Sequence, residues 1–237
     1  MITFAQIAIG EGGLVACTRC TDSSTGLTAS PRDASEVARE ITAAAGSWSR
    51  GPGPNVTFVG FEPFAHPALP QLIAEAVAAG VVRLRLRTDG GALATGANAV
   101  GILAAGVRHL EVVVLAAGEE HDRLSGRSGL AAACDGGVRA FVAAAARDGL
   151  RVAVTGRVPV CRHNARGAAG AVAWLASLGA VAVHLDATAC READGPLVLA
   201  ALDTAAVHGL AASVSGDLFA MAPQWAHRAW AEIEVGE

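Results

Sequence analysis

Short runs rich in β-branched residues alternate with Ala-rich stretches of helical periodicity along nearly the whole chain. Between consecutive runs there is room for a crossover helix, which predicts parallel βαβ units instead of hairpins. Six such units form either a doubly wound sheet or a curved, incomplete (β/α) barrel. In both architectures the chemistry lies in the loops after the carboxyl ends of the strands. We expect strands at 2–9, 56–59, 82–86, 110–115, 152–158 and 181–185, with a possible seventh at 212–214.

Local start signals support several of the helices between these strands. Asp33 opens a sequence of the capping-box type, and Pro70 stands where the first turn of a helix tolerates proline. Helices are also expected at 130–147 and 165–177, the second with Asn164 as its N-cap.

Composition limits the classes of function that are open to the chain. With 237 residues, of which 52% are hydrophobic and 17% charged, we expect a single folded domain over 1–237. A net charge of -4 and the absence of any basic tract argue against nucleic-acid and anionic-membrane partners. Charged residues and glycines interrupt every apolar run before it could span a membrane, and the first residues lack the charged start of a signal peptide. We therefore expect a cytoplasmic protein.

The residue types that are missing exclude particular mechanisms. The chain has no Lys and no Tyr, so it cannot form a lysine Schiff base, use a P-loop lysine or employ a phenol as an acid. Its five cysteines are an odd number, in which Cys17 and Cys20 form a close pair and the others lie far downstream. In a reducing compartment this pattern indicates metal ligation or burial instead of a disulfide framework.

The loops after the first three expected strands carry three motifs in a fixed order. They are Cys17-Thr-Arg-Cys20, then Gly60-Phe61-Glu62-Pro63, then Thr88-Asp89-Gly90. This order resembles the radical S-adenosylmethionine (radical SAM) superfamily, in which a CxxxCxxC loop follows the first strand, a GGEP-type motif the second and often Thr-Asn-Gly the third. The resemblance covers almost the whole chain. It implies an α/β fold, a partial (β/α)6 TIM-like barrel of the radical SAM type.

The chain departs from the family pattern at three positions. Gly13 stands where the first cysteine of CxxxCxxC belongs, Phe61 replaces the second glycine of the GGEP-type motif, and Asp89 replaces the asparagine. In the family, three thiolates hold a [4Fe–4S] cluster, and SAM binds the fourth iron and yields a 5′-deoxyadenosyl radical. With Gly13 in place one thiolate is missing, so a cluster needs a substitute ligand. The candidates are Glu11, Asp22, a distant cysteine or a residue of a partner protein.

The resemblance assigns roles to individual residues, and each role has a simpler alternative. Cys17 and Cys20 are candidate cluster ligands, remnants in a loop, or zinc or redox thiols. Glu62, within the candidate SAM-binding stretch Gly60–Pro63, either helps to hold the SAM ammonium group or serves as a turn residue.

Three further sites are also open to either a functional or a simpler structural interpretation. Thr88 and Asp89 are candidate cofactor contacts, with Asp89 alternatively a turn residue before Gly90. Arg157, at the end of the fifth expected strand, is a candidate for a carboxylate or ribose contact, and 119–122 is expected to be a solvated loop. No catalytic residue is assigned.

Two functions from different classes follow from the resemblance. The first is a degenerate member, a pseudoenzyme that works as an accessory or partner subunit beside a competent radical SAM protein in natural-product or peptide modification. The second is a working radical SAM enzyme that keeps SAM and a [4Fe–4S] cluster through a non-standard ligand set and abstracts hydrogen from a small molecule or peptide. A third, weaker reading is an aldolase-like barrel without SAM.

Overall fold

The computed structural model describes residues 4–12, 14–15, 17, 30–49, 53–190, 192–215 and 234–235. These residues fall into two compact units, which are described in turn. The first unit runs from the N-terminal strand to the start of strand β6 and takes in most of helix α5. The second holds the end of β6 and the elements from β7 onward.

The sheet of the first unit is parallel and follows the expected strands. Its order is β1 (Ala5–Ala8), β4 (Asn55–Val59), β5 (Arg83–Thr88) and then β6 (His109–Val113). Val56 pairs with Ala5 of β1 and with Leu84 of β5. Because all these strands run in the same direction, the loops that follow β4 and β5 emerge at the same edge of the sheet.

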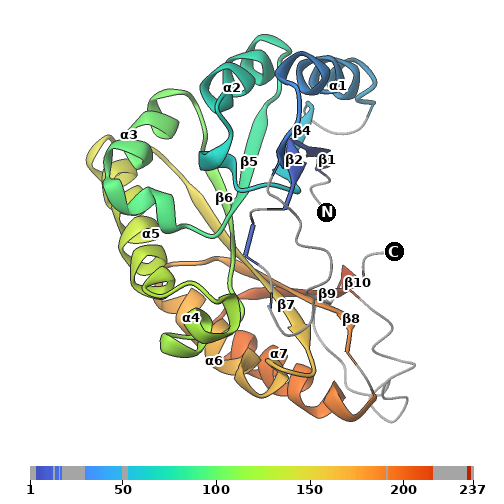
Figure 1. The fold of residues 1–237 in the computed structure, drawn as a ribbon, viewed down its shortest axis with the longest axis vertical. Coiled ribbons are helices and arrows are strands. Elements are labelled where there is room, and N and C mark those ends of the chain that lie inside the picture. The colour runs from blue at the N-terminus through green and yellow to red at the C-terminus, as the bar shows by residue number, and fades with distance from the viewer. Residues whose placement is uncertain are drawn as a thin grey trace. The chain divides into compact units, whose positions relative to one another are not determined.

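Helices pack along this sheet as the start signals predict. The helices of the first unit are α1 (Ala34–Gly46), α2 (Leu69–Ala78), α3 (Ala97–Ala104) and α5 (Leu130–Arg147), with the short helices η1 (Pro63–Ala65) and η2 (Gly91–Thr95). The Asp33 carboxylate caps α1 by accepting from the backbone N–H groups of Ser35 and Glu36, and Pro70 lies in the first turn of α2. Figure 1 shows α1 and α2 side by side, and their residues are in contact.

Helix α5 approaches the loop after β5 unusually closely. A Cβ atom at Gly137 would lie 2.4 Å from the carbonyl oxygen of Gly90 and 2.7 Å from the Cβ of Leu93. Glycine inside a helix costs about 1 kcal/mol relative to alanine. Here the missing side chain lets the helix backbone rest directly on the loop.

The second unit repeats the strand and helix alternation. Its elements are α4 (Glu119–Ser125), β7 (Ala153–Cys161), η3 (Ala165–Gly167), α6 (Ala168–Ser177), β8 (Ala182–Ala189), η4 (Glu192–Asp194), α7 (Gly195–Val207), β9 (Ala211–Ser215) and β10 (Glu234–Val235). Strands β7, β8, β9 and β10 lie in that order, and each pair is parallel. The possible seventh strand is therefore present as β9.

Two local predictions in this unit need correction. Asn164 occupies the N-cap position of η3, but its side chain makes no capping hydrogen bond, because it accepts from the backbone N–H of Cys161 and donates to the carbonyls of Leu115 and Pro159. Residues 119–122 are not a solvated loop but the start of α4. His121 is fully buried there, and its Nδ1 accepts from the backbone N–H of Leu115.

In the part of the chain that the structure describes, no single helix is both long enough and apolar enough to cross a membrane. One pair of helices with a sharp bend between them reaches that length and hydropathy only when the two are taken together.

Candidate functional site

The loops after β4 and β5 form a connected polar site in the first unit. We call the residues Gly60–Pro63 and Thr88–Gly90 the Glu62 platform. Its centre is the Glu62 carboxylate, which is 7% exposed. One carboxylate oxygen accepts from the Thr88 hydroxyl at 2.8 Å and from the Phe64 backbone N–H at 3.3 Å, and the other accepts from the Asp89 backbone N–H at 2.9 Å. A single side chain therefore ties the two loops together.

Thr88 and Asp89 complete the platform with turn interactions. The Thr88 hydroxyl accepts from the backbone N–H of Gly90, and the Asp89 carboxylate accepts from the backbone N–H of Gly91. Gly90 has a φ of 78°, in the left-handed region that glycine adopts without strain. The expected turn role of Asp89 before Gly90 is thus present, with the Asp89 residue 1% exposed.

Burial dominates the electrostatics of the platform. It raises the pKa of Glu62 to about 7, and the nearby Asp89 charge adds to this rise, while the three hydrogen bonds to the carboxylate oppose it. Burial likewise raises the pKa of the Cys134 thiol, which is next to Gly90, to about 12, with the charges of Asp89, Asp135 and Glu62 contributing. Glu62 is therefore poised to change its charge near neutral pH, whereas Cys134 stays a thiol.

Two glycines allow the β4 loop to pack against the N-terminal segment. Gly60 has a φ of 83°, and a Cβ there would lie 2.5 Å from the carbonyl oxygen of Gly10. A Cβ at Gly10 would in turn lie 2.9 Å from the Phe61 ring. Gly10 belongs to β2 (Gly10–Glu11), which pairs antiparallel with β3 (Ser30–Pro31). Phe61, the departure from the GGEP-type motif, is 3% exposed and fills the space beside this ladder.

His66 links the loop after β4 to the segment just before α1. Its Nδ1 accepts from the backbone N–H of Ala68, so the proton sits on Nε2, which donates to the carbonyl of Arg32 at 3.1 Å. The ring also lies edge-on to Phe61, with centroids 6.1 Å apart. His66 is thus part of the support of the platform.

The expected metal ligands fall largely outside the described residues. Gly13 and Cys20 are outside them, and Cys17 is buried at 6% exposure. Among the residues that the structure describes, no group of three or more His, Cys, Asp or Glu side chains is arranged to hold a metal ion. The described residues alone therefore do not provide the three thiolates that hold such a cluster.

The second unit carries a different polar cluster around Arg157. Strand β7 continues to Cys161, so Arg157 lies within the strand and not at its end as expected. The Arg157 guanidinium pairs with Asp186 of β8 at 2.5 Å, and Asp186 also accepts from the Ser215 hydroxyl of β9. His184 contacts the hydroxyls of Ser213 and Ser215 through its two ring nitrogens. We call these five residues the Arg157 network.

Strand register brings the Arg157 network together on one face. Arg157 is level with His184, and His184 with Ser213, so their side chains point to the same side of the sheet. The opposite side faces helix α6, because a Cβ at Gly156 would lie 2.3 Å from Leu175. Sequence reasoning found Arg157 but missed its partners. The alternation of polar and apolar residues in 182–186 and 211–215 is the signal that could have identified them.

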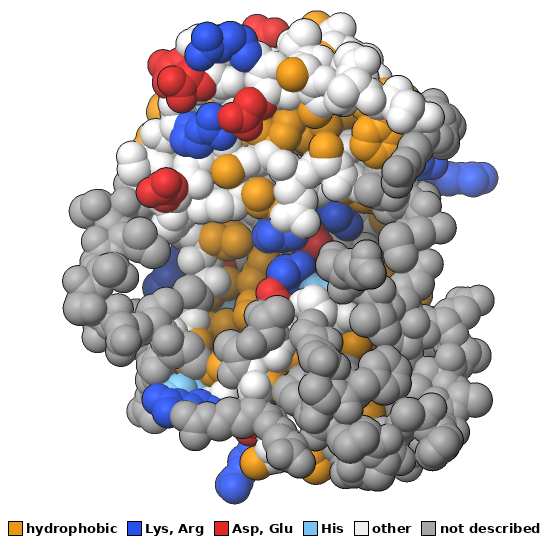
Figure 2. Space-filling view, turned by 90° about the vertical axis from the view of Figure 1, so that its right-hand side faces the viewer, with side chains coloured by type: hydrophobic (Ala, Val, Ile, Leu, Met, Phe, Trp, Pro, Cys, Tyr) orange, Lys and Arg blue, Asp and Glu red, His pale blue; other side chains and the backbone are white. Residues whose placement is uncertain are grey.

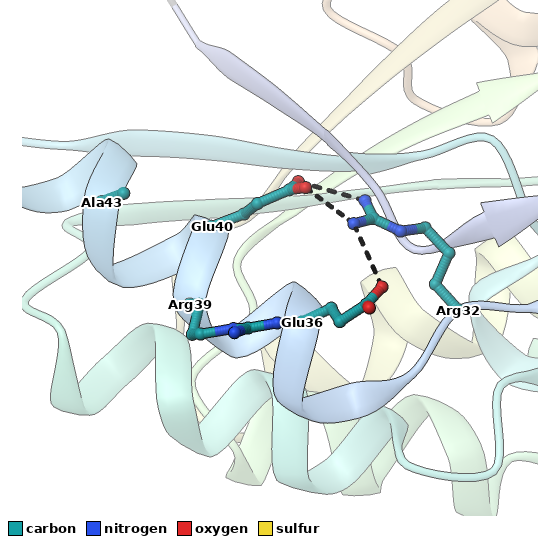
Figure 3. A pocket seen from close by; sticks show the side chains of 5 residues that line it. All are labelled: Arg32, Glu36, Arg39, Glu40 and Ala43. Atoms are coloured by element: carbon teal, nitrogen blue, oxygen red, sulfur yellow. Dashed lines mark hydrogen bonds and ion pairs between the residues drawn. The ribbon is translucent and has the colours of Figure 1, made fainter.

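A hollow of about 400 Å³ lies on the surface of the first unit. It is lined by Arg32, Glu36, Arg39, Glu40 and Ala43 (Figure 3), and Arg32 binds Glu40 at 2.7 Å and 3.1 Å. Figure 2 shows acidic and basic side chains intermingled at the top of the face it presents. Exposed ion pairs of this kind contribute little free energy, and we assign no site here.

Comparison with known proteins gives structural matches alone. No protein-family model matches the chain, and no curated protein matches it by sequence. Among solved structures, Streptococcus suis SuiB bound to the precursor peptide SuiA matches with a TM-score of 0.67 and 11% identity, over 94% of this chain and 52% of SuiB. SuiB bound to S-adenosylmethionine matches with a TM-score of 0.62 and 12% identity, over 98% of this chain and 51% of SuiB.

Two proteins described as radical SAM methyltransferases have the same fold. One, from Sphaerobacter thermophilus, has a TM-score of 0.58 and 19% identity over 88% of this chain and 64% of its own. The other, TsrM from Kitasatospora setae with cobalamin and a [4Fe–4S] cluster, has a TM-score of 0.51 and 15% identity over 77% and 36%. This chain spans about half the length of SuiB. Its fold is the partial (β/α)6 TIM-like barrel of radical SAM enzymes, as the order of its motifs predicts.

Proposed function

We propose that this chain is a degenerate radical SAM protein that works as an accessory or partner subunit, without radical chemistry of its own, in natural-product or peptide modification. The observation that carries the proposal is Gly13, which leaves the cluster loop with two cysteines where the family has three. Glycine has no side chain that could replace the thiolate. The fold match to SuiB, a protein solved with a precursor peptide, supports the class of pathway.

The geometry of the Glu62 platform also supports this proposal. Each oxygen of the Glu62 carboxylate already accepts hydrogen bonds from the chain itself, and Phe61 occupies the space that a second glycine would leave open. The platform therefore braces two loops with the groups that a cofactor would otherwise contact. A protein that has lost its cofactor needs such internal partners, because buried polar groups without hydrogen bonds are costly.

The second candidate function is a working radical SAM enzyme with a substitute cluster ligand. The observation that favours it is that Glu62, Thr88 and Asp89 are buried and joined in one hydrogen-bond network. When bound, a cluster with SAM would supply a 5′-deoxyadenosyl radical for hydrogen abstraction. In this reading Cys17 and Cys20 hold irons, while the loops Gly60–Pro63 and Thr88–Asp89 contact SAM.

Anaerobic reconstitution with iron and sulfide separates the two functions. We expect the wild-type chain to take up no stable cluster, measured by iron counting and electron paramagnetic resonance with and without SAM. Gly13→Cys should increase iron uptake, and Gly13→Ser, which adds a side chain without a soft thiolate, is the matched control. About four irons per wild-type chain, with a signal that shifts when SAM is added, would overturn the accessory role.

A second measurement tests whether the chain works with a partner protein. The tagged chain, isolated anaerobically from its native cells, should carry a second protein with a complete CxxxCxxC motif, which mass spectrometry identifies. Product formation by that partner should fall when this chain is removed and return when it is added back. A partner that is equally active alone would contradict the accessory role.

A further inference from the structure

Strand β5 carries three arginines in alternation with two leucines. Its sequence from Arg83 to Arg87 is Arg-Leu-Arg-Leu-Arg. Leu84 and Leu86 are buried at 7% and 0% exposure, so they point into the hydrophobic core. Because side chains alternate across a strand, Arg83, Arg85 and Arg87 all lie on the other face of β5.

The neighbouring strands place polar partners on the same face. Arg85 and Arg87 both pair with Glu111 of β6, which is 4% exposed as a residue. The Arg85 Nε donates to the Thr57 hydroxyl of β4 at 3.0 Å, and its guanidinium lies 4.1 Å from the centroid of the Phe4 ring. We call Arg83, Arg85, Arg87, Thr57 and Glu111 the arginine face.

Charge on the arginine face is not balanced by these partners. Among the described residues, three guanidinium groups face the single Glu111 carboxylate, and Arg83 has no carboxylate ion-pair partner there. The positive charges of the arginine face also act on the imidazole of His109, at the start of β6. Burial is the main cause that lowers the pKa of His109, and the charges of Arg83 and Arg85 lower it further.

Clustered arginines of this kind are unfavourable without a counter-anion. The Arg85 and Arg87 side chains are 18% and 12% exposed, so water screens their mutual repulsion less than on an open surface. An oxyanion would relieve this repulsion. The guanidinium fork also matches the two oxygens of a carboxylate or phosphate group.

We propose that the arginine face binds the carboxylate or phosphate group of a small molecule. Arg83 makes the primary contact, and Arg85, held in place by Thr57 and Glu111, supplies the second charge. The alternation along β5 fixes the spacing of these groups on a rigid strand. This inference goes beyond the proposed function, since it requires neither a cluster nor SAM.

Anion binding to the full chain tests the inference directly. Isothermal titration calorimetry at pH 7 and low chloride should show saturable binding of inorganic phosphate, of succinate or of both, and the comparison tells a phosphate site from a carboxylate site. Sodium chloride at matched ionic strength is the control for non-specific screening. We expect Arg83→Gln to weaken binding at least about tenfold, the loss of one charge-assisted contact.

Matched variants keep the result interpretable. Arg39→Gln removes the same charge from the exposed side of α1 and should leave anion affinity unchanged. Arg83→Lys keeps the charge without the fork and should fall between wild type and Arg83→Gln. If Arg83→Gln fails to fold by circular dichroism, Arg83→Lys still provides the comparison.

Three results would overturn the inference. One is the absence of saturable binding of either anion, as expected if a carboxylate from elsewhere in the chain already covers the face. Another is unchanged affinity in both Arg83 variants, and the third is an equal loss in Arg39→Gln. None of these readouts involves iron or SAM, so failure of the inference is distinct from failure of the accessory role.

Discussion

The Glu62 platform of the first unit and the Arg157 network of the second are both polar clusters beside parallel strands, but they are built differently. In the platform, backbone N–H groups supply most of the donors and the acidic side chains are at most 7% exposed. In the Arg157 network the contacts described above join pairs of side chains, and the Arg157 and Asp186 side chains are 20% and 22% exposed.

This difference predicts how the two clusters respond to change. A buried carboxylate that accepts from fixed backbone groups cannot be rearranged, so losing one partner leaves another group unsatisfied. Partly exposed side chains can recruit water instead. Substitutions in the platform and its supports should therefore cost more free energy than substitutions in the Arg157 network.

The largest effect is expected at Gly60, the first residue of the platform. Gly60→Ala combines a φ of 83° with a Cβ 2.5 Å from a backbone carbonyl oxygen, and it should lower the free energy of unfolding by about 3 kcal/mol or more. Gly80→Ala is the matched control, because its φ is 80° but nothing lies within 4 Å of the added Cβ. It should cost about 1 kcal/mol. Equal urea midpoints for the two variants would show that the close approach to Gly10 contributes nothing.

Asn164, in the second unit, tests whether the free-energy cost of losing hydrogen bonds depends on burial or on the unit in which the residue lies. Asn164→Ala removes hydrogen bonds to two carbonyls and one N–H, and it should cost about 2 to 3 kcal/mol in urea unfolding. Asn98→Ala, which removes one side-chain bond to the carbonyl of Ala92 at a half-buried position, should cost about 1 kcal/mol or less. If Asn164→Ala cost as little free energy as Asn98→Ala, hydrogen bonds between a buried side chain and backbone groups would not explain the difference between the two clusters.

The platform should also show a distinct pH dependence. Because the pKa of Glu62 is raised from 4.5 to about 7, the folded chain holds a proton between these values that the unfolded chain has released. Its stabilising contribution is complete below about pH 4.5 and is lost as the pH rises through about 7. Glu62→Gln should remove this component, at a cost of about 1 to 2 kcal/mol near pH 5 because the amide meets backbone donors.

Urea unfolding of wild type and Glu62→Gln from pH 5 to pH 8 measures this component. The difference in free energy of unfolding should narrow as the pH rises, since the wild type loses stability that the variant never had. A difference that stays constant, or widens with pH, would contradict the assignment of the titrating group to Glu62.

The smallest effect is expected in the Arg157 network. Asp186→Asn removes a partly exposed ion pair and should change the free energy of unfolding by about 1 kcal/mol or less, measured in urea. Arg157→Gln should have a similar effect, and the double variant should be little worse than either single one, because both remove the same pair. A cost above that of Glu62→Gln would reverse the comparison.

Much of the fold could be predicted, because parallel βαβ units leave a strong alternating pattern. The strands were expected within a few residues, and the cap at Asp33 and the full extent of α5 are confirmed. The motif order also led to Glu62, Thr88 and Asp89, which the structure brings into contact. The single-domain expectation for 1–237 stays a prediction, as do the roles of Cys17 and Cys20.

What the sequence could not supply were contacts set by register and by close backbone approach. Asn164 has the residue type of an N-cap, but its amide is taken by carbonyls from residues 115 and 159, which periodicity does not place nearby. His121 follows two acidic residues, a pattern that predicts an exposed position, but the fold buries it completely. The arginines of β5 were visible, but Glu111 becomes their partner only when β6 is aligned beside them.

Gly137 has a consequence for motion. Because the backbone of α5 rests on Gly90 and Leu93 without an intervening side chain, the loop after β5 has no room to move toward that helix. Opening the loop in that direction requires displacing an 18-residue helix. Amide hydrogens of the Thr88–Gly90 loop should therefore exchange with deuterium as slowly as those of the middle of α5, in one cooperative opening event. Any ligand that enters there meets a preformed surface and not a lid.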